Sequence, residues 1–350
     1  MLKARRKTVV AVLATLVMAV MFVGTDAASA APTRGADQTG GYIYQDNRAP
    51  GGPTFTIRNA PTTILNAPDD DTEANVTLPF TFNFYGVNRS VMTVGVNGAV
   101  VFPGSQQVSF VNQAFSAANQ DMIAPLWDDW QVFGRIGTGL SGTAPNRVFT
   151  VHWDDVRPFG GLPADAVDFQ MQLFERGSVI EFHYLEVESD VSHDLGVSAT
   201  VGIDHGATSN LQYSFNAASL VNNRAIRFTP VRCQGQVPTF TGTFGPDVIN
   251  GTAGPDVIVA LSGNDTVNTG AGNDIVCAGD GNDVVNLGAD NDKANGDNGN
   301  DTLSGRGGND RLDGGANADT LRGGAGLGDV CLGRTGIDNA AGCESLSGVP

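Results

Sequence analysis

The sequence predicts an all-β protein with an N-terminal β-sandwich-like domain over residues 46–231 and a C-terminal parallel β-roll over residues 242–322. Two observations predict this class. The first part contains short segments of alternating apolar and polar residues separated by turn signals, which is typical of antiparallel strands. The second part repeats every nine residues and is rich in glycine and aspartate, which indicates a stacked repeat. No long helical period competes with either pattern.

The first 30 residues have the three parts of a secretory signal peptide. Four basic residues lie between positions 3 and 7, an apolar stretch covers residues 8–23, and Ala28-Ser29-Ala30 is a small-residue cleavage site. The apolar stretch is short for a span of about 20 residues, so we expect cleavage and not anchoring. No later apolar run is long enough to cross a bilayer. We therefore expect a secreted protein, extracellular or associated with the cell surface, without a membrane span.

The middle of the chain predicts a series of short strands. Phe80, Phe82 and Phe84 alternate with polar residues, as in a half-buried strand. Asn97-Gly98 and Arg176-Gly177 each lie between two apolar segments and predict hairpins. Further strands are expected over residues 147–153, 200–203, 211–215 and 225–228. The small polar residues 31–45 and the segment 232–241 are expected to be linkers.

Written in rows of nine from Gly242, the repeat region shows three registered columns. The fourth column is mostly glycine and the eighth is aliphatic. The sixth is aspartate in nine consecutive rows: Asp247, Asp256, Asp265, Asp274, Asp283, Asp292, Asp301, Asp310 and Asp319. Glycine enters conformations with positive φ at low cost, so positions one to six form a turn. Positions seven to nine form a short strand whose eighth side chain points inward, and two rows close one coil. Alternate aspartates then stack into two ladders spaced by about 4.8 Å.

The two ladders predict a calcium-binding role. Carboxylates one coil apart repel each other unless a cation lies between them. Carboxylate oxygens with backbone carbonyls from glycine turns select calcium over zinc or copper, and magnesium fits less well. Ladders of five and four aspartates enclose at most about seven sites. A disordered tail is the alternative, but an inward aliphatic column has no role there. We expect folding of the roll to be coupled to calcium binding.

The repeat region resembles the RTX family of nonapeptide repeats, whose unit is Gly-Gly-x-Gly-x-Asp-x-aliphatic-x. Residues 269–277 and 305–313 are close copies of this unit. The resemblance implies a parallel β-roll with several calcium ions bound between its turns. The family usually leaves the cell without an N-terminal signal, so its export route is not carried over to this chain.

The repeat has departures from that unit. Asp290 and Asn317 replace the fourth glycine, and Ala294 weakens the eighth column, which puts the neighbouring sites in doubt. After Arg322 the register gains one residue. We expect residues 323–350 to form a cap.

Four cysteines in a secreted chain predict two disulfides. Cys331 and Cys343 are close in sequence and are expected to pair, which leaves Cys233 with Cys277. Three pairings are possible, and the sequence does not select one.

Candidate catalytic groups in the middle region are limited to two acidic pairs beside tryptophans. Asp128, Asp129, Asp154 and Asp155 could supply the acid and base of glycoside hydrolysis. Turns at strand ends with buried tryptophans, or a sugar-binding platform, explain the same residues. No metalloprotease, serine-hydrolase or phosphate-loop motif accompanies them. We therefore expect a binding role, with a secreted hydrolase as the alternative.

The histidines and the net charge of the chain limit which metals and macromolecules we expect as partners. His152 and His183 are expected at exposed polar strand positions and not at a metal site, because no close ligand spacing accompanies them. The formal net charge of −17 argues against nucleic acid as a partner.

Residues 78–230 are loosely similar to nidogen-type extracellular modules. Residues 122–129 (Met-Ile-Ala-Pro-Leu-Trp-Asp-Asp) and 225–230 (Ala-Ile-Arg-Phe-Thr-Pro) carry that similarity. It implies adhesion or binding to an extracellular ligand, a protein or a polysaccharide, which the sequence does not identify.

Overall fold

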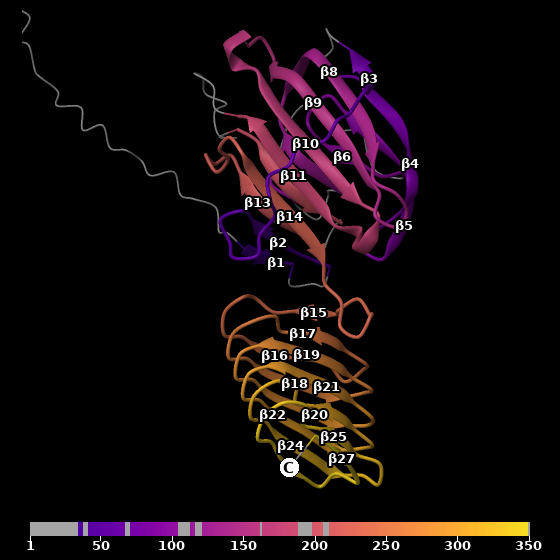
Figure 1. The fold of residues 1–350 in the computed structure, drawn as a ribbon, viewed down its shortest axis with the longest axis vertical. Helices are drawn as coiled ribbons and strands as arrows, with labels where there is room; N and C mark the ends of the chain where they lie inside the picture. Colours follow the sequence, from indigo (N-terminus) through magenta and orange to yellow (C-terminus); the bar gives the residue numbers. More distant parts are fainter. Residues whose placement is uncertain are drawn as a thin grey trace, which may run out of the picture.

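The computed structural model describes residues 34–37, 41–66, 71–103, 113–115, 121–161, 163–187, 198–205 and 210–348. The predicted signal peptide lies outside the described residues. Within them the chain forms strands and two short 3-10 helices, η1 (Pro163–Asp165) and η2 (Arg176–Ser178), and no α-helix. An antiparallel two-sheet part precedes a parallel roll (Figure 1). The predicted fold class is confirmed. No described helix has the length and apolar character needed to span a bilayer.

The larger sheet of the N-terminal part has eight antiparallel strands. In spatial order they are β1 (Arg34–Ala36), β2 (Tyr42–Asp46), β14 (Arg224–Pro230), β11 (Ile180–Glu186), β10 (Val167–Phe174), β9 (Val148–Pro158), β8 (Trp130–Ser141) and β3 (Thr62–Asn66). The predicted turn at Arg176-Gly177 is η2, which joins β10 to β11.

The smaller sheet has six antiparallel strands. In spatial order they are β13 (Asn210–Phe215), β12 (Thr200–Asp204), β7 (Met122–Trp127), β6 (Val100–Val101), β5 (Val87–Gly95) and β4 (Glu73–Phe84). The predicted alternation holds in β4, where Phe80, Phe82 and Phe84 are buried and Thr81 is exposed. Gly98 turns β5 back to β6 with a φ of 71°, and an added Cβ would lie 1.9 Å from the Leu126 carbonyl oxygen, so this turn requires glycine.

Aromatic side chains fill the space between the two sheets. Trp153 stacks on Phe169, with ring centroids 5.0 Å apart, and its indole Nε1–H donates to the Gly95 carbonyl of the opposite sheet at 3.0 Å. The Tyr184 hydroxyl donates to the Pro125 carbonyl at 2.5 Å. The polar groups of these two buried side chains thus each have an acceptor on the facing sheet. Trp130 and Trp153 are buried in this core, and Trp127 is buried in a separate cluster beside Phe115, so none of the three tryptophans forms an exposed sugar platform.

The expectation of a linker over residues 31–45 is wrong for two segments. Residues 34–36 form β1, and residues 42–46 form β2 between β1 and β14. Tyr42 and Tyr44 are buried in the sandwich core, and Tyr44 lies opposite Phe228. The alternation is only five residues long and follows a glycine pair, so its strand pattern was too short to recognise in the sequence.

The roll consists of coils stacked along one axis, and the strands of successive coils form two parallel sheets (Figure 1). One contains β15 (Phe240–Thr241), β17 (Val257–Val259), β19 (Ile275–Asp280), β21 (Lys293–Asn298), β23 (Arg311–Asp313), β25 (Val330–Leu332) and β27 (Ser345–Ser347). The other contains β16 (Val248–Asn250), β18 (Thr266–Ala271), β20 (Val284–Ala289), β22 (Thr302–Gly307), β24 (Thr320–Ala325) and β26 (Asn339–Ala341). Paired residues are 18 apart, as in Val267 opposite Val285, so two rows make one coil as predicted.

The roll extends beyond the predicted limit at residue 322. Leu312 lies opposite Cys331, and Leu321 lies opposite Ala340, so the spacing of one coil grows from 18 to 19 residues. The extra residue is absorbed in the turn around Leu327, whose side chain is 93% exposed. Residues 323–347 are therefore further coils of the roll, and the separate cap that we expected is incorrect. Cys331 and Cys343 form a disulfide within these coils.

A second disulfide fastens the chain between the two parts to the roll. Cys233 is bonded to Cys277 in β19, and it is buried beside Val231 and Val259. Residues 232–241 are thus not a free linker, because they hold this anchor and end in β15, the first strand of one roll sheet.

Loss of the Cys233–Cys277 disulfide is expected to destabilise the roll more than loss of Cys331–Cys343. The bridged residues are 44 apart in the first pair and 12 apart in the second. The chain-entropy relation gives about 4 and about 3 kcal/mol respectively. Urea titrations of the two double Cys→Ala variants, followed by far-UV circular dichroism in calcium, check this order. Tryptophan fluorescence serves as the control, because all three tryptophans lie in the sandwich. A larger loss for the second pair would contradict the expectation.

Candidate metal centre

The sixth-column aspartates stand at the junction of each turn with its strand and are hydrogen-bonded along the roll axis. The backbone N–H of Asp265 donates to Oδ1 of Asp283, one coil further, at 2.8 Å. The same bond, between 2.8 and 3.0 Å, joins every such pair: Asp247 to Asp265, Asp256 to Asp274, Asp274 to Asp292, Asp283 to Asp301, Asp292 to Asp310, Asp301 to Asp319, Asp310 to Asp329 and Asp319 to Asp338. The two predicted ladders are therefore continuous chains of charged acceptors.

One carboxylate oxygen is left without a protein donor in every ladder residue after the first of each ladder. Oδ2 is buried and has no hydrogen-bond partner among the described residues in Asp265, Asp274, Asp283, Asp292, Asp301, Asp310, Asp319, Asp329 and Asp338. Each of these residues is at most 6% exposed. A buried carboxylate oxygen that no donor satisfies is costly. A regular row of such oxygens fits a hard divalent cation, because calcium takes carboxylate and carbonyl oxygens as ligands.

Glycine in the first column makes room for these oxygens. A Cβ added at Gly305 would lie 2.2 Å from Asp310 Oδ2, and one at Gly314 would lie 2.3 Å from Asp319 Oδ2. Any side chain there would occupy the space beside the carboxylate. Gly242 and Gly251 stand in the same way beside Asp247 and Asp256, whereas the middle rows have side chains in the first column, such as Ala278 and Leu287, which add to the apolar core.

Burial raises the pKa of seven ladder carboxyls, and neighbouring carboxylates raise it further: Asp265, Asp274, Asp283, Asp292, Asp301, Asp310 and Asp319. The pKa of Asp265 and Asp319 rises to about 6, and that of Asp292 and Asp301 to about 7. Around Asp301 the added charges belong to both ladder neighbours and to Asp297, while the N–H of Asp283 opposes them. In the absence of a cation, Asp292 and Asp301 are therefore partly protonated near neutral pH.

The first aspartate of each ladder differs from the rest. Thr243 donates to Asp247 Oδ2 through its N–H at 2.6 Å and its hydroxyl at 3.0 Å. Thr252 makes the same two bonds to Asp256, at 2.7 and 3.1 Å. The second oxygen of these two carboxylates thus has protein donors, so threonine takes the place that a cation would fill further along.

The rows that depart from the repeat keep its turn geometry. Asp290 and Asn317 have φ values of 78° and 81°, the left-handed conformation that aspartate and asparagine tolerate better than most residues. Asp290 also accepts a bond from the Gly272 N–H at 3.2 Å. In the row that contains the small Ala294, the first column supplies Leu287 to the same core.

The prediction from the sequence did not include Asp329 and Asp338 among the candidate ligands, although the structure places both in the ladders. The inserted residue hid Asp329, which is found once a spacing of 19 is allowed for one coil. Beyond it, the carboxylate of Glu344 accepts the Asp329 N–H at 2.8 Å. A fifth-column ladder of asparagines was also missed, in which each side-chain oxygen accepts an N–H one coil away: Asn264, Asn273, Asn282, Asn291, Asn300 and Asn309.

The four aspartates of the sandwich do not converge on one site. Asp128 lies in the β7–β8 turn and accepts a hydrogen bond from Ser198, and the Asp129 carbonyl accepts the Phe159 N–H at 3.0 Å. Asp154 lies in β9 five residues before Phe159, and the register of β8 and β9 places it opposite Arg135 and not beside Asp129. Asp155 is bound instead by Arg157, at 2.8 Å. Paired glycosidase carboxyls lie roughly 5 to 9.5 Å apart. This arrangement therefore does not favour the hydrolytic alternative.

Two histidines lie on the outer face of the larger sheet, but His183 is not exposed as expected. It is fully buried and bonded to Glu181 at 2.9 Å, because residues 54–58 run over this part of the face.

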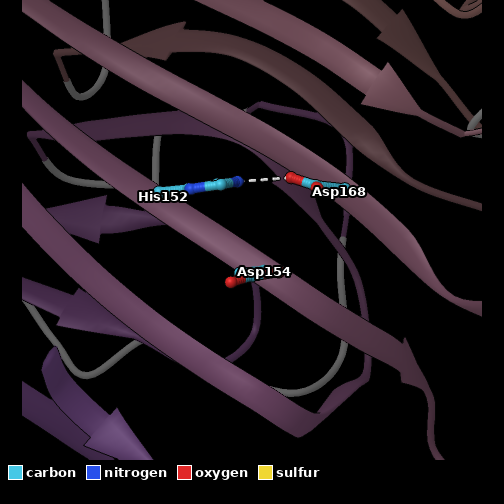
Figure 2. A group of neighbouring side chains, drawn as sticks. All are labelled: His152, Asp154 and Asp168. Atoms are coloured by element: carbon cyan, nitrogen blue, oxygen red, sulfur yellow. Dashed lines mark hydrogen bonds and ion pairs between the residues drawn. The ribbon is translucent and has the colours of Figure 1, made fainter. Parts of the chain in front are cut away.

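His152 is close to Asp154 and Asp168, with ligand atoms within 4.8 Å of one another. Figure 2 shows His152 and Asp168 pointing toward each other across β9 and β10. The guanidinium of Arg135 lies 3.5 Å from Asp154 and already supplies a positive charge there.

Replacing one ladder carboxylate is expected to have opposite effects with and without calcium. Asp301→Asn keeps an oxygen to accept the Asp283 N–H but removes a buried charge. In thermal unfolding experiments, the free energy of unfolding of the roll should fall by about 1–3 kcal/mol in calcium. In chelator the same free energy should rise or stay unchanged. The matched control is Asp247→Asn, whose carboxylate has threonine donors, and it should show a smaller loss in calcium. Equal losses for both variants would contradict this assignment.

The roll is expected to respond to pH in opposite directions in the two conditions. Folding raises the carboxyl pKa from about 3.9 to between about 6 and about 7, so the metal-free roll is most stable below about pH 4. It loses stability as the pH rises through 6 and 7. Calcium requires ionised carboxylates, so in calcium the stability should rise over that interval. Far-UV melts between pH 4 and 8 measure both trends, and parallel curves in the two conditions would refute the expectation.

Comparisons with known families agree with both parts of the fold. A family model described as NIDO related matches residues 44–242. A second, described as RTX calcium-binding nonapeptide repeat, matches residues 241–276, 278–294 and 295–327. Searches of the curated proteins and of the solved structures gave no match. The second family model describes calcium-binding repeats, which supports calcium as the ion of this region. The chain belongs to the NIDO-related family and carries RTX calcium-binding nonapeptide repeats in its C-terminal part.

Proposed function

We propose that this chain is a secreted protein whose roll folds on calcium outside the cell and supports a recognition or adhesion module. One observation carries the proposal, namely the two rows of buried aspartates in which nearly every carboxylate has one oxygen without a hydrogen-bond donor. Such rows disfavour the compact state unless cations compensate their charge. Metal binding then supplies the free energy of folding. The roll therefore acts as a calcium-dependent spacer or attachment element.

In this proposal the calcium ligands are the sixth-column aspartates together with the two that the insertion hid. The cations lie between consecutive members of each ladder, with backbone carbonyls of the glycine turns as further ligands. The extended ladders of six and five aspartates enclose at most about nine sites. The first aspartate of each ladder, Asp247 or Asp256, contributes less, because Thr243 and Thr252 already bind their second oxygens.

Three features support secretion. Residues 1–30 carry the signal-peptide pattern. The two disulfides suit an oxidising compartment. Extracellular calcium sites bind in the range of about 10⁻⁴ to 10⁻³ M, so a weak ladder would stay unfolded inside the cell and fold after export.

The sandwich is proposed as a recognition module for an extracellular ligand. Its tryptophans are in the core, and its acidic pairs are held apart by the strand register. A binding surface built on rigid strands and their loops suits these observations better than hydrolysis does. We place the start of this module at residue 34 and not at 46, because β1 and β2 complete its larger sheet.

The mature chain, residues 31–350, tests the coupling of folding to calcium. Far-UV circular dichroism in chelator should show the sandwich alone, and adding calcium should increase the β signal in one cooperative step. Tryptophan fluorescence should not change, because all three tryptophans report on the sandwich. Magnesium at the same concentration is the control and should produce little of the change. A β signal that is already complete in chelator at pH 7.5, or that never rises with calcium, would overturn the proposal.

A further inference from the structure

A cavity of about 350 Å³ opens at one end of the larger sheet, and we call it the arginine pocket. Three arginines line it, Arg58, Arg147 and Arg176, together with Phe174, Ser141 and Asn146. The lining comes from the end of β8, the turn into β9, the end of β10 and η2. The strand register places the pocket at the end of the sheet where β14 leaves toward the roll.

The arginines of this domain divide into two groups. Residues 46–231 contain nine arginines, no lysine and nineteen acidic residues, so their net charge is −10. Seven of the arginines form an ion pair with a carboxylate: Arg48, Arg89, Arg135, Arg147, Arg157, Arg224 and Arg227. The other two, Arg58 and Arg176, have no carboxylate partner among the described residues, and both line the arginine pocket. The pocket is thus a positive site in an acidic domain.

Arg58 is held in a fixed position by neutral groups. Its Nε–H donates to the side-chain oxygen of Gln172 at 2.8 Å, and an Nη1–H donates to the Ser141 hydroxyl at 3.2 Å. Its guanidinium lies over the Phe174 ring, 5.7 Å from the centroid. Gln172 is fully buried and donates to the Thr56 carbonyl at 2.8 Å, so the partner of Arg58 is itself fixed. Two of five N–H donors are used, which leaves three for a ligand.

The other two arginines have different roles. Arg147 is neutralised by Glu175, with bonds of 2.9 Å from Nε and 2.6 Å from an Nη, so it forms a wall of the pocket without adding net charge. Arg176 is exposed on η2, where its long side chain can reach a ligand at the pocket mouth. The pocket therefore combines one preorganised guanidinium with one mobile guanidinium.

We propose that the arginine pocket binds a single sugar unit that carries a carboxylate or a sulfate group. The guanidinium fork matches the planar or tetrahedral oxyanion in a bidentate manner. Ser141 and Asn146 offer hydrogen bonds to ring hydroxyls, and Phe174 offers an apolar face. The volume is at the lower end of small-molecule sites, which suits one ring and not a long segment. The assignment deepens the proposed recognition role and rests on it.

The test uses the mature protein in saturating calcium, with binding measured by isothermal titration calorimetry. The probes are glucuronate for the carboxylate, glucose 6-sulfate for the sulfate, and glucose as the neutral control. At least one anionic sugar should bind at least tenfold more tightly than glucose, and the comparison of the two identifies the group. Arg58→Gln and Arg176→Gln should each weaken that binding, Arg58→Gln by about tenfold, since a charge-assisted bidentate contact is lost.

Arg135→Gln is the matched control, because it removes the same charge from β8 outside the pocket and should leave sugar binding unchanged. Arg58→Lys keeps the charge but not the fork and should still bind more weakly than the native chain. Unchanged tryptophan fluorescence confirms that the variants are folded. The proposal is overturned if glucose binds as well as the anionic sugars, or if Arg135→Gln weakens binding as much as Arg58→Gln. Binding of an acetylated peptide through its C-terminal carboxylate, without glucuronate or glucose 6-sulfate binding, would also overturn it.

These outcomes are separate from those for the roll. Calcium-dependent folding is read from circular dichroism, whereas the pocket is read from sugar binding in calcium. Failure of the sugar assay with a normal calcium response would remove this inference and leave the calcium-dependent roll in place.

Discussion

The structure of the roll depends on one electrostatic constraint, the stacking of like charges at the distance between strands. Each coil brings a buried aspartate next to the aspartates of the coils above and below it. One carboxylate oxygen is used to join the coils through a backbone N–H, and the other is left for a cation. The same residue thus provides the hydrogen bond that sets the register and the charge that opposes it. A calcium ion between the carboxylates would resolve this conflict, which is why folding and binding are proposed as a single event.

The remaining columns of the repeat follow from that constraint. Positive φ values in the turns explain why glycine dominates the fourth column, and why only aspartate and asparagine replace it at residues 290 and 317. First-column glycines in the later coils leave space beside the carboxylate, as at Gly305 and Gly314. Asparagine in the fifth column ties neighbouring turns together with a second row of hydrogen bonds beside the aspartate ladder. The thin aliphatic core keeps the two sheets together but is too narrow to offset many buried charges.

The sandwich is stabilised differently from the roll. Its two sheets bury large aromatic residues, and several of their polar tips donate to a carbonyl of the facing sheet, as Trp153 does to Gly95. Its arginines are mostly neutralised by carboxylates, so the unpaired guanidiniums of the arginine pocket are distinctive. The Cys233–Cys277 disulfide fastens the chain that leaves the sandwich to the second coil of the roll. The two parts therefore depend on different forces, apolar burial in one and charge compensation in the other.

The repeat period by itself predicted the stacked coils and the two aspartate ladders, because a fixed spacing of nine residues brings every second row into register. The oxygen ligands and the resemblance to RTX repeats then predicted calcium as the ion. Alternation and turn residues likewise determined most strands of the sandwich. Only the tertiary structure decided which aspartates are equivalent. It brought Asp329 and Asp338 into the ladders through a coil of 19 residues, and it gave Asp247 and Asp256 threonine partners. It also placed Asp128 far from Asp154, and it gathered Arg58 and Arg176 at one pocket. The physical reason is that sequence patterns report on neighbours along a strand or repeat, whereas distances between strands depend on register and packing.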